Sequence, residues 1–105
     1  MIVESRLESD GMLVLTVMAK TLTSFDAAEF RETARSAIAR SAGRVAVDCL
    51  QLEFIDSSGV GALLHVNNLL PEARRPVRLT KVGPKVLATL ELMRVHRQFE
   101  LDPRI

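Results

Sequence analysis

Short runs of apolar or alternating residues along the chain predict five β-strands. These runs cover residues 2–8, 12–18, 44–50, 77–82 and 98–101. Asp10 and Gly11 separate the first two runs and form a typical tight-turn pair, so these two strands are expected to form a hairpin. Residues 44–50 are apolar at both alternating positions apart from Asp48, which predicts a central strand covered on both faces.

Between these runs the apolar spacing changes to that of helices. Helical periodicity covers residues 24–41 and 57–70, and a third helix is expected to start at Pro84. Thr23 or Ser24 can cap the first helix. The resulting order, ββαβαβαβ, predicts one α/β domain over residues 1–105, with a mixed sheet of four to five strands flanked by helices.

Composition and charge change this picture little. The chain is 48% hydrophobic and 26% charged, with a net charge of +1. The densest basic stretch contains Arg74, Arg75, Arg78, Lys81 and Lys85. We interpret it as a solvated rim, with a docking patch for an acidic partner as the alternative. No stacking aromatics interleave these residues, so a nucleic-acid partner is not expected.

The expected compartment is the cytoplasm. No apolar run has the length of a membrane span, and the first ten residues do not resemble a signal peptide, so no membrane association is expected. Cys49 is the only cysteine and lies in an apolar run. It therefore predicts a buried thiol in a reducing compartment and not a disulfide, nucleophile or metal ligand.

Residues 54–64, FIDSSGVGALL, are the most unusual stretch, because Gly59 and Gly61 fall in the first turn of the predicted helix. Glycine costs a helix about 1 kcal/mol relative to alanine. Nucleotide binding would explain glycines between a strand and a helix, but Leu64 stands where the dinucleotide fingerprint needs a third small residue. The chain also lacks the lysine of a P-loop.

A serine hydrolase is also disfavoured. The nucleophile elbow needs glycine two residues before the serine, and Ile55 occupies that position. His65 falls two turns beyond Ser57 on the same helix, and His96 lies in a basic segment. The sequence contains no metal-ligand spacing and no signal for a cofactor, so we predict that the protein is not an enzyme.

Two readings of the stretch remain from the residues themselves. In the first, Ser57 is a substrate: its hydroxyl lies at a helix start, where a phosphate adds about −1.5 to −2 charges, and the two glycines let another protein approach. In the second, Ser57 or Ser58 caps the helix, Asp56 satisfies first-turn N–H groups, and the glycines permit tight helix–sheet packing.

The run VAVDCLQLEFIDSSGVGALL, residues 45–64, resembles the signature of STAS domains, and specifically of bacterial anti-sigma factor antagonists. In that family a hydrophobic strand is followed by D-S-S/T-G-x-G opening a helix. The hairpin, the long first helix and the closing segment VRLTKVGPKVLATLELMRVHRQFEL follow the family order, so the resemblance covers essentially the whole chain.

The resemblance implies a switch protein. Its unphosphorylated form binds an anti-sigma factor that is also a serine kinase with a histidine-kinase-like ATP-binding fold, and it releases the protein that this kinase holds. The kinase then phosphorylates the serine that matches Ser57, with Ser58 as the second choice, and the complex weakens. A PP2C-type serine phosphatase removes the phosphate. Partner contacts are implied for Asp56, Ser57, Ser58, Gly59, Val60 and Gly61.

One position departs from the family. Many antagonists carry aspartate where this chain has Thr23, and we expect Thr23 or Asp26, one turn later, to take part in docking. The family also includes modules of anion transporters and lipid-transport systems and stress-sensing scaffolds. The absence of a membrane span argues against the first and the intact serine pair against the second. A non-switching scaffold subunit of a larger assembly therefore remains the alternative. A minimal hydrolase ranks third.

Overall fold

A computed structural model describes residues 2–103 and shows the predicted α/β architecture. Residues 1, 104 and 105 of the predicted domain lie outside this range. The elements, in chain order, are β1 (Val3–Leu7), β2 (Leu13–Val17), β3 (Thr21–Leu22), α1 (Ser24–Ala39), β4 (Val45–Asp48), β5 (Phe54–Ile55), α2 (Ser57–Leu69), the 3₁₀ turn η1 (Glu72–Arg74), β6 (Arg78–Val82), α3 (Pro84–Leu92), the 3₁₀ turn η2 (His96–Gln98) and β7 (Glu100–Pro103).

Five strands form one mixed sheet in the order β1-β2-β4-β6-β7. β1 and β2 form the predicted antiparallel hairpin, and the other neighbours are parallel. The register aligns Leu15, Val47, Leu79 and Leu101 in one row across the sheet. These side chains share one face, because alternate residues of a strand point to opposite sides.

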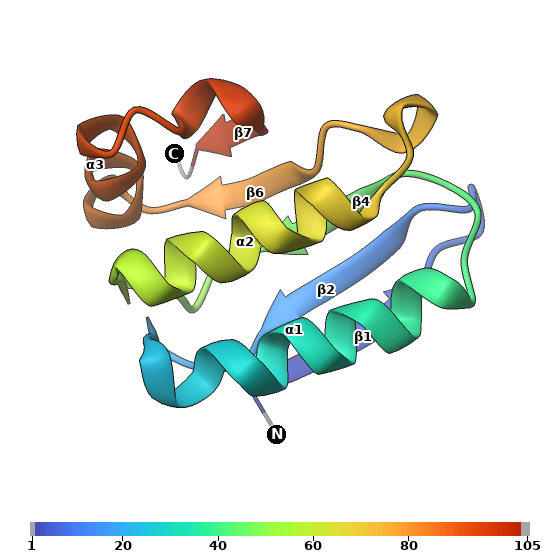
Figure 1. Cartoon of the computed structure of the whole chain (residues 1–105), viewed down its shortest axis with the longest axis horizontal. Coiled ribbons are helices and arrows are strands. Elements are labelled where there is room, and N and C mark those ends of the chain that lie inside the picture. Colours follow the sequence, from blue (N-terminus) through green and yellow to red (C-terminus); the bar gives the residue numbers. More distant parts are fainter. Residues whose placement is uncertain (1, 104–105) are drawn as a thin grey trace.

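Helices α1 and α2 cover that face and lie side by side in front of the sheet in Figure 1. Their inward residues include Phe30 and Ala34 from α1 and Val60 and Leu63 from α2, all fully buried. The strand row and these helix residues belong to one hydrophobic core, which fixes how α2 lies on the sheet.

The opposite face of the sheet is polar, so the expectation that residues 44–50 are covered on both faces is wrong. The next row across the sheet is Arg6, Val14, Ala46, Arg78 and Glu100. Ion pairs join the strands there, including that of Lys81 with Asp48 and that of Arg78 with Asp102. Small and charged residues occupy this face where a second helical layer would need larger apolar ones.

A second, two-stranded sheet was not predicted. β3 and β5 pair in parallel, with Thr21 opposite Phe54 and Leu22 opposite Ile55. Strands of two residues are too short to show a hydrophobic period, so no sequence pattern predicts them. This small sheet connects directly to the starts of α1 and α2 and therefore positions the candidate site.

The basic stretch from Arg74 to Lys85 is mostly engaged within the molecule. Arg74 donates to the carbonyl of Gly43 and to the hydroxyl of Ser41, and Arg75 donates to the carbonyl of Leu70. Arg78 and Lys81 form the ion pairs across the polar sheet face. These contacts favour the solvated rim over an acidic-partner patch.

Two further expectations can be compared with the structure. Cys49 is fully buried, as predicted. Within residues 2–103, every helix is too short or too polar to cross a bilayer.

Candidate functional site

The candidate site lies where two helices start side by side. The parallel pairing of β3 with β5 brings Thr23 and Asp56 to the same level, and these residues are the N-caps of α1 and α2. Figure 1 shows both helix starts at the left end of the molecule, the end toward which the arrowheads of β2 and β6 point. Ser57 and Ser58 are the first two residues of α2 and therefore lie at this end.

Asp56, and neither serine, caps α2. Its Oδ1 accepts a hydrogen bond of 2.9 Å from the N–H of Gly59, and its backbone carbonyl accepts one of 2.9 Å from Val60. The hydroxyls of Ser57 and Ser58 have no hydrogen-bond partner among residues 2–103; Ser57 is exposed and Ser58 half-buried. The structure thus supports the interpretation that Asp56 caps the helix, and the two serine hydroxyls take no part in the capping.

The two glycines have different surroundings. A side chain at Gly59 would overlap the backbone carbonyl of Leu22 and the side chain of Ile55, whereas at Gly61 it would meet open space. Gly59 therefore allows α2 to lie close against β3, as the packing reading expected. Gly59 and Val60 are both buried, and their expected contact with a partner stays a prediction. Gly61 is exposed, and its suggested role in approach stays a prediction.

Thr23 and Asp26 lie at the start of α1, beside the start of α2. Thr23 is the N-cap by position, but its hydroxyl makes no capping hydrogen bond. Asp26 is half-buried in the first turn, and among residues 2–103 its carboxylate has no hydrogen-bond or ion-pair partner. Both residues are thus brought to the end of the molecule that carries Ser57.

The geometry does not assemble a hydrolytic site around Ser57. His65 is eight residues further along α2, a rise of about 12 Å. His96 lies in η2, and Gln98 of the same turn contacts Asn67, ten residues beyond Ser57 along α2. Neither imidazole is placed to take a proton from Ser57.

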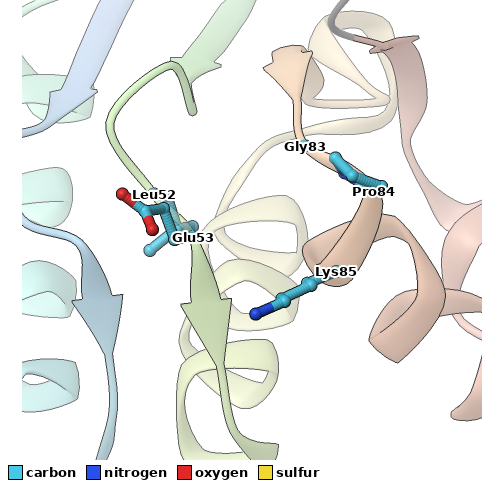
Figure 2. A pocket seen from close by; sticks show the side chains of 5 residues that line it. All are labelled: Leu52, Glu53, Gly83, Pro84 and Lys85. Carbon is cyan, nitrogen blue, oxygen red and sulfur yellow. The ribbon is translucent and has the colours of Figure 1, made fainter.

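A shallow pocket of about 190 Å³ lies beside β5, between the segment Leu52–Glu53 and the start of α3. Its other lining residues are Gly83, Pro84 and Lys85. Figure 2 shows the Lys85 side chain extending from α3 toward the segment with Leu52 and Glu53. No sequence pattern marks this pocket, because its walls come from segments about thirty residues apart in the chain.

Asn67 is a further residue whose importance the sequence did not reveal. It is the one polar side chain fully within the core of the described residues, at 7% exposure. Its Oδ1 accepts from the N–H of Val77 at 2.9 Å and its Nδ2 donates to the carbonyl of Gln98 at 3.1 Å. Asn67 therefore joins α2 to the segment that precedes β6 and to the segment that follows α3. In the sequence, the only signal for this role was the position of Asn67 on the apolar side of the predicted helix.

Comparison with known proteins supports a single assignment of the chain. The family model "Mlab, STAS domain" matches residues 7–102. No curated protein sequence matches significantly.

Solved structures with this fold carry related descriptions. An anti-sigma factor antagonist from Mycobacterium paratuberculosis has a TM-score of 0.82 at 20% identity, covering 96% of this chain and 86% of the other. An anti-sigma-factor antagonist (STAS) domain protein from Planctomyces limnophilus has a TM-score of 0.83 at 18% identity, covering 96% and 88%.

The Bacillus cell fate determinant SpoIIAA in its phosphorylated form has a TM-score of 0.69 at 17% identity, covering 94% and 89%. At these identities the structural matches establish the fold. The family model covers nearly the whole described domain, with the DSSGVG motif at the start of α2. The chain therefore belongs to the STAS-domain family.

Proposed function

We propose that this chain is a partner-switching protein that acts as an anti-sigma factor antagonist and is controlled by phosphorylation of Ser57. The unphosphorylated form binds an anti-sigma factor that is also a serine kinase with a histidine-kinase-like ATP-binding fold, and thereby releases the protein which that kinase holds. Phosphorylation by the same partner ends the binding, and a PP2C-type phosphatase restores it. Similarity to solved anti-sigma factor antagonists supports this role.

The observation that carries the proposal is that Asp56, and not Ser57, caps α2. Asp56 alone accepts the capping hydrogen bond, so the exposed Ser57 hydroxyl is available for transfer of a phosphoryl group without loss of the cap. The N-terminal end of a helix also tolerates an added anion, because the helix dipole is positive there. Phosphorylation is therefore expected to leave the fold in place and to add negative charge to this surface.

A phosphate on Ser57 would oppose docking in two ways. It adds about −1.5 to −2 charges next to Asp56, and these charges must be desolvated if a partner covers them. An unpaired charge in an interface costs several kcal/mol of binding, enough to change the bound population by a factor of about 10³.

The test uses Ser57→Ala and Ser57→Glu proteins as baits in lysate of the native host. The alanine bait should retain a serine kinase with a histidine-kinase-like fold, identified by mass spectrometry, and the glutamate bait should lose it. Asp102→Asn, a surface change on the polar sheet face away from Ser57, serves as the matched control and should behave like the unaltered bait. Equal retention by the alanine and glutamate baits would show that Ser57 does not control binding.

The alternative function is a non-switching STAS subunit of a larger regulatory or transport assembly. The description of the matching family model, which names Mlab and no antagonist, keeps this alternative in view. Under it, both baits would retain the same assembly and no kinase. Genes for a kinase of the stated fold and a PP2C-type phosphatase beside the gene of this chain would favour the switch.

A further inference from the structure

We propose that an apolar rim surrounds the Ser57 end of the molecule and docks into an apolar pocket of the kinase-fold partner. The rim consists of Met18, Phe25, Leu50 and Phe54, which are 42%, 95%, 50% and 50% exposed. This inference rests on the function proposed above and names the chemistry by which the partner recognises the unphosphorylated site.

The rim residues come from segments that meet at one end of the sheet. Met18 directly follows β2 and Leu50 lies just beyond β4, so both lie at the carboxyl ends of parallel strands. The amide of Gln51, next to Leu50, contacts the sulfur of Met18 at 3.8 Å. These two segments are therefore held together.

Phe54 and Phe25 bring the rim to the two helix starts. Phe54 belongs to β5, and its N–H donates to the carbonyl of Lys20 at 3.0 Å, which ties it to the segment after Met18. Phe25 is the second residue of α1, one position beyond the level of Ser57 in α2. The β3–β5 pairing keeps these starts adjacent, so both aromatic residues lie at the end of the molecule that carries Ser57.

All four side chains of the rim are at least 42% exposed. Scattered single exposed apolar residues are ordinary, but a group of them beside a candidate site indicates an interaction surface. Four of the seven large apolar side chains that are exposed in residues 2–103 belong to the rim; the others are Leu7, Leu92 and Met93. Phe25 in particular contributes almost no burial to the core.

The size of the rim favours a transient partner over a second copy of the chain. With 150–250 Å² for a whole aromatic side chain, the four exposed fractions amount to roughly 400 Å². That is about half of the roughly 800 Å² that each side of a standard interface buries, and well below the interface of an obligate dimer. A regulated complex, which must also dissociate, fits this area.

The rim residues themselves carry no charge. Helix α2 contains no aspartate, glutamate, lysine or arginine. Lys20 and Glu53, which border the rim, have opposite signs, and Asp26 and Asp56 add negative charge at the two helix starts. A phosphate on Ser57 would then enter an apolar interface, where a charge without a partner is strongly unfavourable.

The experiment is a calorimetric titration with the recombinant kinase-fold protein that the Ser57→Ala bait retains. Phe25→Ser and Phe54→Ser are each introduced into Ser57→Ala, and Leu92→Ser is the matched control, because Leu92 is also exposed (84%) but lies at the end of α3. Each rim substitution should raise Kd by about tenfold or more, and the control by less than about twofold. Kd should change less than about threefold between about 0.1 M and 0.5 M salt.

Distinct outcomes separate this inference from the proposed switch. If both rim variants bind as tightly as Ser57→Ala while Ser57→Glu still loses binding, the rim is wrong and the switch stands. If Ser57→Ala and Ser57→Glu bind alike, the switch fails and the rim proposal fails with it. A dimer of the chain alone that Phe25→Ser dissociates in sedimentation would assign the rim to a second copy. Circular dichroism checks folding, and Phe25→Ser decides the matter if Phe54→Ser unfolds.

Discussion

At the scale of single residues, the starts of α1 and α2 differ in how they are capped. Asp56 caps the helix through the N–H of Gly59, whereas Thr23 occupies the same position of α1 without a side-chain cap. Asp56→Ala should therefore lower the free energy of unfolding by about 1 kcal/mol and Thr23→Ala by clearly less. Ser57→Ala should change it by less than about 0.5 kcal/mol. Urea denaturation of the three variants measures these differences, and a large loss with Ser57→Ala would return the serine to a structural role.

The two glycines provide a matched pair at the same scale. Gly59→Ala should destabilise the protein by about 1–3 kcal/mol, because the added carbon overlaps the Leu22 carbonyl and backbone cannot easily give way. Gly61→Ala should stabilise it by up to about 1 kcal/mol, because the same carbon meets open space in a helix. Thermal unfolding compares the two directly. If Gly61 serves the approach of a partner, its alanine variant will be more stable and yet bind more weakly.

The sequence indicated that these residues form a candidate site, but it did not show which role each residue has. The sequence left open whether Ser57 caps the helix or accepts a phosphate, since a serine hydroxyl can do either. The Leu22 carbonyl and the Ile55 side chain distinguish Gly59 from Gly61, and Leu22 lies in a strand about 35 residues earlier in the chain. Long-range packing of this kind leaves no local pattern.

At the scale of elements, hydrophobic periodicity predicted each helix and all five strands of the main sheet. It did not predict β3 and β5, which are too short to show a period. It also gave the wrong surroundings for β4: Ala46 is buried although its face of the sheet carries charged side chains. An apolar residue type reports that a position is buried, but not whether a helix or neighbouring long side chains bury it.

Asn67 links several elements and should be costly to replace. Asn67→Leu replaces the amide by an apolar side chain of similar size, but it leaves the N–H of Val77 and the carbonyl of Gln98 without this partner. A buried polar group left unsatisfied costs about 1–3 kcal/mol, so the free energy of unfolding should fall by at least that amount. Asn68→Leu, at an exposed position one residue later, is the control for helix propensity. Equal stability of the two variants in urea would contradict the linking role.

The edge strand β7 contributes a pH-dependent contact. The Arg44 guanidinium donates to the Glu100 carboxylate at 2.7 Å and lowers the pKa of Glu100 below its ordinary value of 4.5. A lowered folded-state pKa stabilises the fold above that ordinary value, and the contribution disappears as the pH falls through the folded-state pKa. Glu100→Gln should therefore flatten the loss of stability below about pH 4.5, which denaturation at a series of pH values measures. An unchanged acid profile would show that solvent screens the exposed pair completely.

At the scale of the whole molecule, the sheet, the two covering helices and the small β3–β5 pair together place Ser57 at one end of the domain. The family and the fold follow from the order of the elements and the DSSGVG motif, and both were predictable from sequence. The exposed apolar rim was not, because Phe25 and Phe54 have the same residue type as core positions such as Phe30, and only the folded arrangement shows which of them face solvent.

The central claim is that a phosphate on Ser57 abolishes binding without disturbing the fold. The most direct measurement uses protein with phosphoserine incorporated at position 57, titrated calorimetrically against the recombinant kinase-fold partner beside the unmodified protein. We expect the phosphorylated form to have an unchanged circular dichroism spectrum and a Kd that is higher by a factor of about 10³. The same Kd for both forms, with both folded, would contradict it.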